Sequence, residues 1–168
     1  PVPRTRLLLQ KLKVSLTLSI FALLLLPIFA WLVGYIAFGS APLQTPLGAT
    51  LTNSEALIRI LIISLYIGFN LLFVSGLSFY LSVRTDVPLG AVGIAVGISI
   101  LFNILDAISA LGDLRKWLPT HYAYSWLDAL AGEIEWSTMI RGASFTAMCG
   151  IVFYALAFTK FARKDIIS

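Results

Sequence analysis

Charged residues are scarce in this 168-residue chain, since Asp, Glu, Lys and Arg together make up only 12% of it. Soluble globular domains average about 25% charged and about 45–50% apolar residues, whereas 59% of this chain is hydrophobic. One core of this size cannot bury that much apolar surface, so the composition excludes an ordinary soluble domain. It predicts instead a protein whose outer surface faces lipid.

Cysteine and histidine each occur once, as Cys149 and His121. A single cysteine excludes an internal disulfide and a cysteine metal cluster, and a single histidine argues against a histidine-rich metal site or a Ser-His-Asp relay. We expect neither residue to carry a special function. The sequence also lacks a G-x-x-x-x-G-K-[ST] phosphate loop, an H-E-x-x-H motif and a G-x-S-x-G motif. We therefore expect no catalytic residue, no metal and no cofactor bound by this chain.

Long apolar runs are what the sequence does contain. Four of them reach the length of about 20 residues that a helix needs to cross a bilayer, over residues 14–38, 56–83, 90–112 and 139–161. None alternates in polarity as a transmembrane strand would. Inside lipid every backbone N–H and C=O must be satisfied within the chain, which favours helices. The sequence predicts an all-α, polytopic transmembrane helical bundle with four spans in a single domain, 1–168.

The positive charges predict the orientation of these spans. Basic residues lie before the first span, between the second and third, and after the fourth: Arg4, Arg6, Lys11, Lys13, Arg84, Lys160, Arg163 and Lys164. Four crossings place all three of these segments on one side, which the positive-inside rule makes cytoplasmic. The opposite side has nearly balanced charge. We expect a multi-pass protein of the cell (cytoplasmic) membrane with a cytoplasmic basic segment at 1–13 and both ends of the chain cytoplasmic. The small, scattered net charge of +4 predicts no nucleic-acid partner.

The predicted external segments differ in character. Residues 39–55 are rich in Pro, Gly and Thr and are expected to form coil, ending in Thr52–Glu55 as a cap for the next helix. Residues 113–138 have apolar side chains spaced by four, which predicts a short amphipathic helix at the external interface: Tyr122, Trp126, Leu130 and Ile134. Aromatic side chains with a polar edge crowd the same segment: Trp117, Tyr122, Trp126 and Trp136. The alternative interpretation is an aromatic belt that only anchors the chain at the headgroups.

Asp106 is the only acidic residue well inside a predicted span, where a lone charge costs several kcal/mol. Helical spacing places Ser99, Asn103 and Asp106 along one side of the third span. This polar stripe either lines a hydrated pathway or forms a satisfied polar contact within the bundle. Arg59 and Arg141, near the external ends of their spans, are the expected partners for an ion pair with Asp106.

Three stretches resemble a known family. The first, at residues 1–11, matches the pattern P-V-x-R-x-x-L-L-x-x-K. The second is W-L-P-T-H-Y at 117–122, followed by W-L-D at 126–128 and by Trp136, and the third is F-A-R-K-D-I at 161–166. Together they resemble the integral-membrane permease subunits of bacterial ABC transporters of the exporter (type 2) class. The order and predicted membrane side of the three stretches agree with the topology deduced from charge.

This resemblance implies that the four spans are the third to sixth of a six-span permease whose N-terminal part is missing here. It implies partnership with a cytoplasmic ABC ATPase that binds ATP and Mg, with a second permease subunit, identical or different, and with membrane lipid. Arg4, Arg6 and Lys11 would then dock on the ATPase. The alternatives are a stand-alone integral membrane protein, such as a membrane-embedded enzyme or an assembly or sensor protein, and a secondary transporter.

Overall fold

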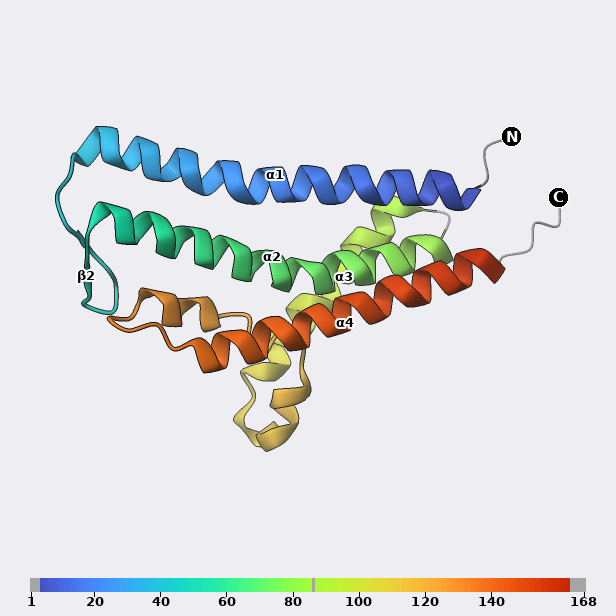
Figure 1. Cartoon of the computed structure of the whole chain (residues 1–168). Coiled ribbons are helices and arrows are strands. Elements are labelled where there is room, and N and C mark those ends of the chain that lie inside the picture. The colour runs from blue at the N-terminus through green and yellow to red at the C-terminus, as the bar shows by residue number, and fades with distance from the viewer. Residues whose placement is uncertain (1–3, 86, 164–168) are drawn as a thin grey trace. The chain divides into compact units, whose positions relative to one another are not determined.

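The computed structural model of the chain is all-α apart from one small hairpin, and four of its helices are long and apolar enough to cross a membrane (Figure 1). It describes residues 4–85 and 87–163, and within these ranges every side chain except those of residues 4, 5, 7, 8, 11, 88, 162 and 163. The elements are α1 (Arg4–Phe38), β1 (Leu43–Gln44), β2 (Thr50–Leu51), α2 (Asn53–Arg84), α3 (Pro88–Asp106), η1 (Ser109–Trp117), η2 (Ser125–Leu130) and α4 (Trp136–Arg163). The predicted all-α, membrane-embedded, polytopic fold is confirmed.

The helices depart from the predicted spans at their ends. The first, second and fourth extend beyond 14–38, 56–83 and 139–161, and α1 in particular begins at Arg4 and includes the basic segment. The third was predicted over 90–112, but α3 ends at Asp106 and the chain continues as the 3₁₀ helix η1. Within η1, Gly112 has φ 51° and ψ −129°, a conformation that residues with a Cβ avoid, so an α-helix cannot continue through it.

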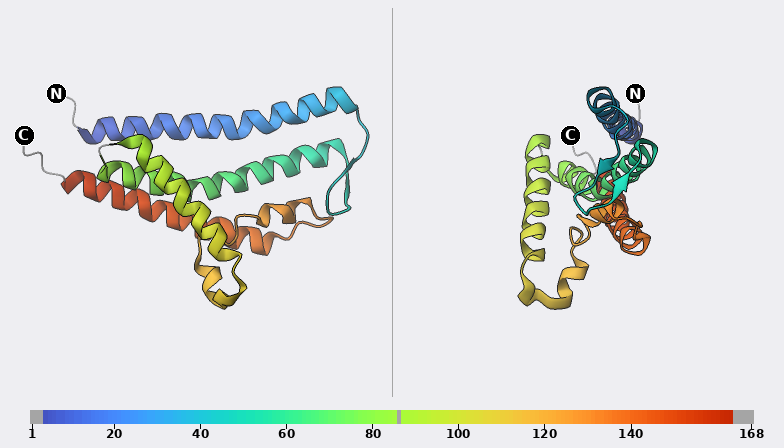
Figure 2. Two further views of the ribbon diagram at one scale, coloured as in Figure 1. Left: turned by 180° about the vertical axis from the view of Figure 1, so that it is seen from behind. Right: turned by 90° about the vertical axis from the view of Figure 1, so that its left-hand side faces the viewer.

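The described chain falls into two compact units. Unit 1 contains residues 4–68 and 125–136, and thus α1, the hairpin, the first part of α2, and η2. In it, the last turns of α1 lie beside the start of α2 (Figures 1 and 2), and the indole Nε1 of Trp31 donates to the carbonyl of Asn53 at 3.1 Å. The segment between them is not the predicted coil throughout, because β1 and β2 pair antiparallel with Leu43 opposite Leu51.

The start of α2 confirms the predicted cap, with different side chains in the main role. Ser54 and Asn53 were expected to accept from free helix N–H groups. Instead the Glu55 carboxylate accepts from both the backbone N–H and the hydroxyl of Thr52, at 2.9 and 2.8 Å. The Glu55 N–H points back to the Thr52 hydroxyl at 3.5 Å. This reciprocal arrangement of a Thr and a Glu three residues later is a capping box.

Unit 2 contains residues 69–124 and 137–163, and thus the second part of α2, α3, η1 and most of α4. Its apolar core has Phe73 of α2 at the centre, with Ala95 of α3 buried beside it and the ring of Phe153 of α4 6.0 Å from the Phe73 ring. Figure 2 shows α3 crossing the neighbouring parts of α2 and α4. The backbones of α2 and α4 touch at Gly76 and Gly150, where a Cβ on Gly76 would lie 2.6 Å from the Gly150 carbonyl oxygen.

Candidate functional site

A polar cluster occupies the end of α3 in unit 2. The Nδ1 atom of His121 lies 2.6 Å from Oδ1 of Asp106, and each side chain is only 25% exposed. Because an ionised carboxylate can only accept, Nδ1 carries the proton in this hydrogen bond. The guanidinium of Arg115 donates to the backbone carbonyl of Asp106 at 3.2 Å. One acid, one imidazole and one guanidinium thus meet at the end of α3.

The fold brings these residues together by turning the chain back after α3. The conformation of Gly112 and successive turns in 109–121 return His121 to the helix end. In these turns the Leu118 N–H donates to the Arg115 carbonyl at 2.9 Å, and the His121 N–H donates to the Leu118 carbonyl at 3.0 Å. The ring of Tyr122 stands edge-on to the imidazole, with ring centroids 4.8 Å apart. We had expected no special role for His121, and the structure makes it the partner of Asp106.

The position of Asp106 also differs from the prediction. It is the last residue of α3 and of that helix's candidate span, Leu89–Asp106, rather than a residue well inside a longer span. A span of 18 residues rises about 27 Å, close to the thickness of the hydrocarbon core, and Asp106 is the final residue of this candidate span. A carboxylate at the end of a span costs much less than one at the centre of a bilayer.

The other members of the predicted polar stripe satisfy their own helix. The Ser99 hydroxyl donates to the Ala95 carbonyl at 3.0 Å, and the Asn103 amide donates to the Ser99 carbonyl at 2.9 Å. Both side chains are half-buried. The Ser99 hydroxyl and one N–H of the Asn103 amide are thus bonded within α3 itself, and these two bonds do not involve the acceptor capacity of either side chain. Ser99, Asn103 and Asp106 thus share α3 as predicted.

Within unit 2 the predicted ion pair between Asp106 and Arg141 does not form, whereas the pair with Arg59 stays a prediction. Asp106 and Arg141 belong to the same unit, and among the described residues of that unit the carboxylate pairs with His121 and makes no ion pair with Arg141. Arg59 belongs to unit 1 and donates there to the backbone carbonyls of Ala129, Ala131 and Gly132. These carbonyls accept from three of the five N–H donors of the guanidinium, so Arg59 has hydrogen-bond partners within unit 1.

The segment 113–138 does not form the predicted amphipathic α-helix. It contains part of η1, then turns, then the short 3₁₀ helix η2, so Tyr122, Trp126, Leu130 and Ile134 do not share one helical face. Of the four predicted interfacial aromatics, Trp117 and Trp136 are 76% and 49% exposed, as residues at a lipid headgroup layer would be. Tyr122 and Trp126 are half-buried.

Charges in this segment shift the pKa of two carboxyl groups in opposite directions. The Lys116 ammonium, 2.7 Å from Oδ1 of Asp113, holds the pKa of that exposed carboxyl below its usual value, and Asp113 raises the pKa of Lys116. For Asp128, partial burial raises the carboxyl pKa, and the nearby charge of Glu135 raises it further. The surroundings of Asp128 thus disfavour its negative charge, whereas those of Asp113 favour it.

The predicted docking residues lie on the first turns of α1. The helix backbone includes Arg4, Arg6 and Lys11, and the Arg6 side chain is exposed, whereas those of Arg4 and Lys11 lie outside the described residues. Residues 1–3 and 164–166, at the outer ends of the first and third family-like stretches, also lie outside them.

The polar cluster can accept and donate hydrogen bonds and can hold a proton, but it is not a metal centre by composition. Within residues 4–85 and 87–163, no group of three or more His, Cys, Asp or Glu side chains is placed to hold a metal ion. Comparisons with protein-family models, with curated proteins and with solved structures find no match for this chain. Its function must therefore be inferred from its own residues and geometry.

Proposed function

We propose that this chain is the permease part of an ATP-driven ABC exporter, in which a separate cytoplasmic ATPase supplies ATP and Mg and a second permease subunit completes the pathway. Four candidate spans support this proposal, because an even number of crossings returns the chain to its starting side. The basic residues gather in the three segments of that side. The family-like stretches described above point to the same class of protein.

One feature of α1 carries the proposal furthest. The candidate span begins at Leu12, but α1 begins at Arg4 and continues without a break to Phe38. A helix of 35 residues is about 52 Å long, well beyond the roughly 30 Å hydrocarbon core. The basic segment with Arg6 is thus a rigid extension of a membrane helix, as a coupling element requires. Force applied to it by a docked partner moves the span directly.

In this proposal, the ATPase acts by biasing one of two arrangements of the membrane helices. ATP binding closes the ATPase pair, and the docked extension of each α1 follows that movement. A partner surface bearing acidic residues would complement Arg4, Arg6 and Lys11. The polar stripe of α3, ending in the Asp106–His121 pair, is the part of unit 2 best suited to contact a polar group of the cargo.

The alternative is a stand-alone membrane protein, either an enzyme or an assembly or sensor protein. The observation that favours it is the Asp106–His121 pair, because a half-buried imidazole held by a carboxylate is a common general base. Such an enzyme would act without an ATPase partner, so co-purification separates the two functions.

The first experiment is purification of the full-length protein in mild detergent, followed by mass spectrometry of its partners. The exporter proposal predicts a near-stoichiometric ATPase with a phosphate loop. Charge reversal at Arg4, Arg6 and Lys11 should release it, whereas the matched reversal Lys116→Glu, in the predicted external segment, should not. A protein that purifies alone in several detergents contradicts the proposal.

The second experiment tests the coupling helix. Gln10 is exposed on α1 just before the candidate span, so changing it removes no core contact. Gln10→Pro removes a helix hydrogen bond and breaks the rigid connection, whereas Gln10→Ala preserves it. We expect Gln10→Pro to retain the ATPase but to reduce transport-coupled ATP hydrolysis at least fivefold. Equal coupling in the two variants would show that the extension transmits no movement.

A further inference from the structure

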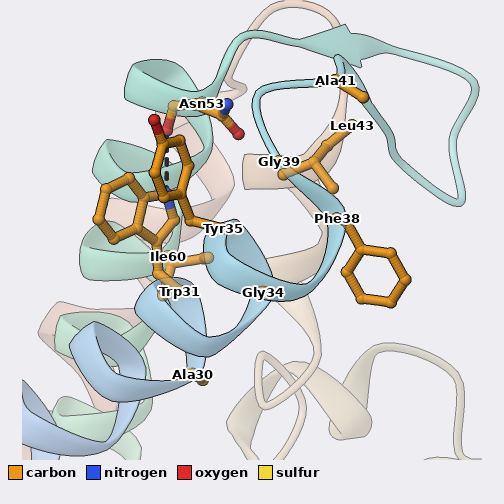
Figure 3. Close-up of a pocket in the computed structure, with 10 residues that line it drawn as sticks. All are labelled: Ala30, Trp31, Gly34, Tyr35, Phe38, Gly39, Ala41, Leu43, Asn53 and Ile60. Atoms are coloured by element: carbon orange, nitrogen blue, oxygen red, sulfur yellow. Dashed lines mark hydrogen bonds between the residues drawn. The ribbon is translucent and has the colours of Figure 1, made fainter.

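A groove in unit 1 lies between the end of α1, the start of α2 and the hairpin loop (Figure 3). Its cavity volume is about 280 Å³. Aromatic rings of Trp31, Tyr35 and Phe38 and the aliphatic side chain of Ile60 line it. For comparison, an apolar cavity of about 150 Å³ holds a benzene molecule. The groove therefore has room for a segment of hydrocarbon chain.

Small residues on α1 keep this groove open. Ala30 and Gly34 are four residues apart and so lie on one face of the helix. A Cβ built on Gly34 would meet no atom within 4 Å. The rings of Trp31 and Tyr35 stack with centroids 5.6 Å apart, and the hydrogen bond from Trp31 to the Asn53 carbonyl fixes the indole (Figure 3). Rigid aromatic walls next to small residues make a preformed slot.

The position of the groove along α1 indicates what surrounds it. Its lining residues Ala30 to Phe38 form the last turns of the candidate span Leu12–Phe38. None of the most apolar window of that span is buried by the described residues, so its surface is open to a hydrocarbon chain. The polar atoms of the groove, the Tyr35 hydroxyl and the Asn53 side chain, lie toward the loop end of α1. The apolar interior of the groove suits the acyl chain of a lipid, and its polar rim suits the headgroup.

The charges near the rim select among lipid headgroups. Between Lys13 and Arg59 the sequence contains a single charged residue, Glu55. The guanidinium of Arg59 is already occupied by three carbonyls of residues 129–132. These carbonyls are neutral and leave Arg59 its positive charge, but the negative charge of Glu55, four residues away on the same helix, offsets it. The charged residues of this segment therefore supply no net positive charge to attract a headgroup that carries net negative charge.

We propose that this groove is a binding site for one acyl chain of a membrane lipid whose headgroup is zwitterionic or uncharged. The chain lies against Gly34 and Ala30 between the aromatic rings, and the headgroup rests by Asn53. Van der Waals contact between the aromatic rings and the acyl chain holds this lipid in the groove. The walls of the groove also restrict its motion, so it stays bound longer than a lipid of the surrounding bilayer stays in place. The proposal does not depend on the exporter function, since it needs no ATPase.

The test uses photoreactive lipid in vesicles containing the full-length protein. Vesicles of phosphatidylcholine carry a trace of phosphatidylcholine with a diazirine in one acyl chain, and labelled residues are mapped by mass spectrometry. We expect labelling concentrated in residues 30–43 and 53–60. Gly34→Leu, which fills the groove, should reduce that labelling at least fivefold. The matched control is Gly93→Leu on α3, because a Cβ there also meets nothing within 4 Å but Gly93 lines no part of the groove.

A second arm tests the headgroup and guards against a folding defect. Unlabelled phosphatidylcholine should compete with the label in the unmodified protein at least fivefold better than phosphatidylglycerol with the same chains. Labelling spread evenly along α1, or unchanged by Gly34→Leu in a protein that elutes as the unmodified one does, overturns the site. Equal competition by the two lipids overturns the headgroup preference.

Discussion

The imidazole of His121 lies 2.6 Å from the carboxylate of Asp106, the last residue of α3. An acidic residue at the C-terminal end of a helix is disfavoured by the helix dipole. The imidazole N–H, together with Arg115 on the Asp106 carbonyl, offsets this by supplying donors at the helix end. The pair also anchors the return of the external segment, because His121 follows the turns after Gly112.

We predict that this pair stabilises unit 2 by direct coupling. Asp106→Asn and His121→Phe should each lower the free energy of unfolding by about 1 kcal/mol, a reduced value for a charged hydrogen bond that is partly exposed. In a double-mutant cycle, the two losses should not add, because either change alone removes the same contact. Reversible unfolding in mixed micelles measures all four proteins.

The matched control for this cycle is the exposed pair Asp113–Lys116, whose carboxylate is 90% exposed. Asp113→Asn should change stability by less than the measurement resolves, since exposed pairs contribute little. Additive losses for Asp106→Asn and His121→Phe would mean that the contact contributes nothing to folding.

Close backbone contact between α2 and α4 makes a second prediction. A Cβ on Gly150 would lie 2.6 Å from the Leu72 carbonyl oxygen, and neither backbone atom can move aside. Gly150→Ala should therefore lower the free energy of unfolding by about 2 kcal/mol, as overpacking does. Gly97→Ala on α3 is the control, because its Cβ meets no atom within 4 Å. This change should cause no loss of stability and should raise it by up to about 1 kcal/mol, since Ala favours a helix over Gly. Similar thermal stability of the two variants in detergent would contradict this packing.

Arg59 makes a third prediction, about unit 1. Its guanidinium donates to three carbonyls at and after the end of η2, two of them at 2.9 and 2.8 Å. Arg59→Leu leaves these acceptors without the cation and should destabilise unit 1 by about 2 kcal/mol. Arg59→Lys keeps the charge but not the planar fork, so its effect should be intermediate. We expect amide hydrogen exchange in residues 125–136 to be faster in both variants, and faster in Arg59→Leu than in Arg59→Lys. Unchanged exchange there would contradict the stabilising role of the Arg59 hydrogen bonds.

Asp128 makes a prediction about pH. Burial and Glu135 raise its pKa in the folded protein, so the folded state holds this proton at pH values where the unfolded chain has released it. Ionisation therefore destabilises the fold as pH rises from the unfolded pKa through the folded one, and the penalty is absent below both. Asp128→Asn should stabilise at pH 7 by no more than about 0.5 kcal/mol, and this gain should vanish near pH 3. A gain that persists at pH 3 would point to a cause other than ionisation.

Much of this architecture follows from local sequence features. Apolar runs long enough to cross a bilayer leave a helix as the only way to satisfy the backbone, so three of the spans were predicted within a few residues. Glu55 three residues after Thr52 similarly marks the start of α2, because a capping box is made by neighbours in sequence. The third span was predicted too long because hydropathy does not register the extended backbone of Ile108, with φ −82° and ψ 104°, which ends the helical path after α3.

The partners of the polar residues could not be predicted in this way. Asp106 was expected to pair with an arginine, since opposite charges attract, yet turns after α3 bring His121 to it first. Arg59 was expected to need a carboxylate, yet three carbonyls satisfy it. A guanidinium accepts either kind of partner, so only the path of the backbone distinguishes them.

The sequence by itself thus determined that the chain forms four helices long and apolar enough to cross a membrane, and where the capping box starts α2. These properties depend on composition, run length and near neighbours, which the printed letters contain. Only the tertiary structure decided that α1 carries its basic segment as a continuous helix, that Gly34 opens a groove beside Trp31, and that His121 meets Asp106. Each of these depends on the path of the backbone. Where the chain turns or continues straight decides which residues meet, and their separation in sequence does not reveal their distance in space.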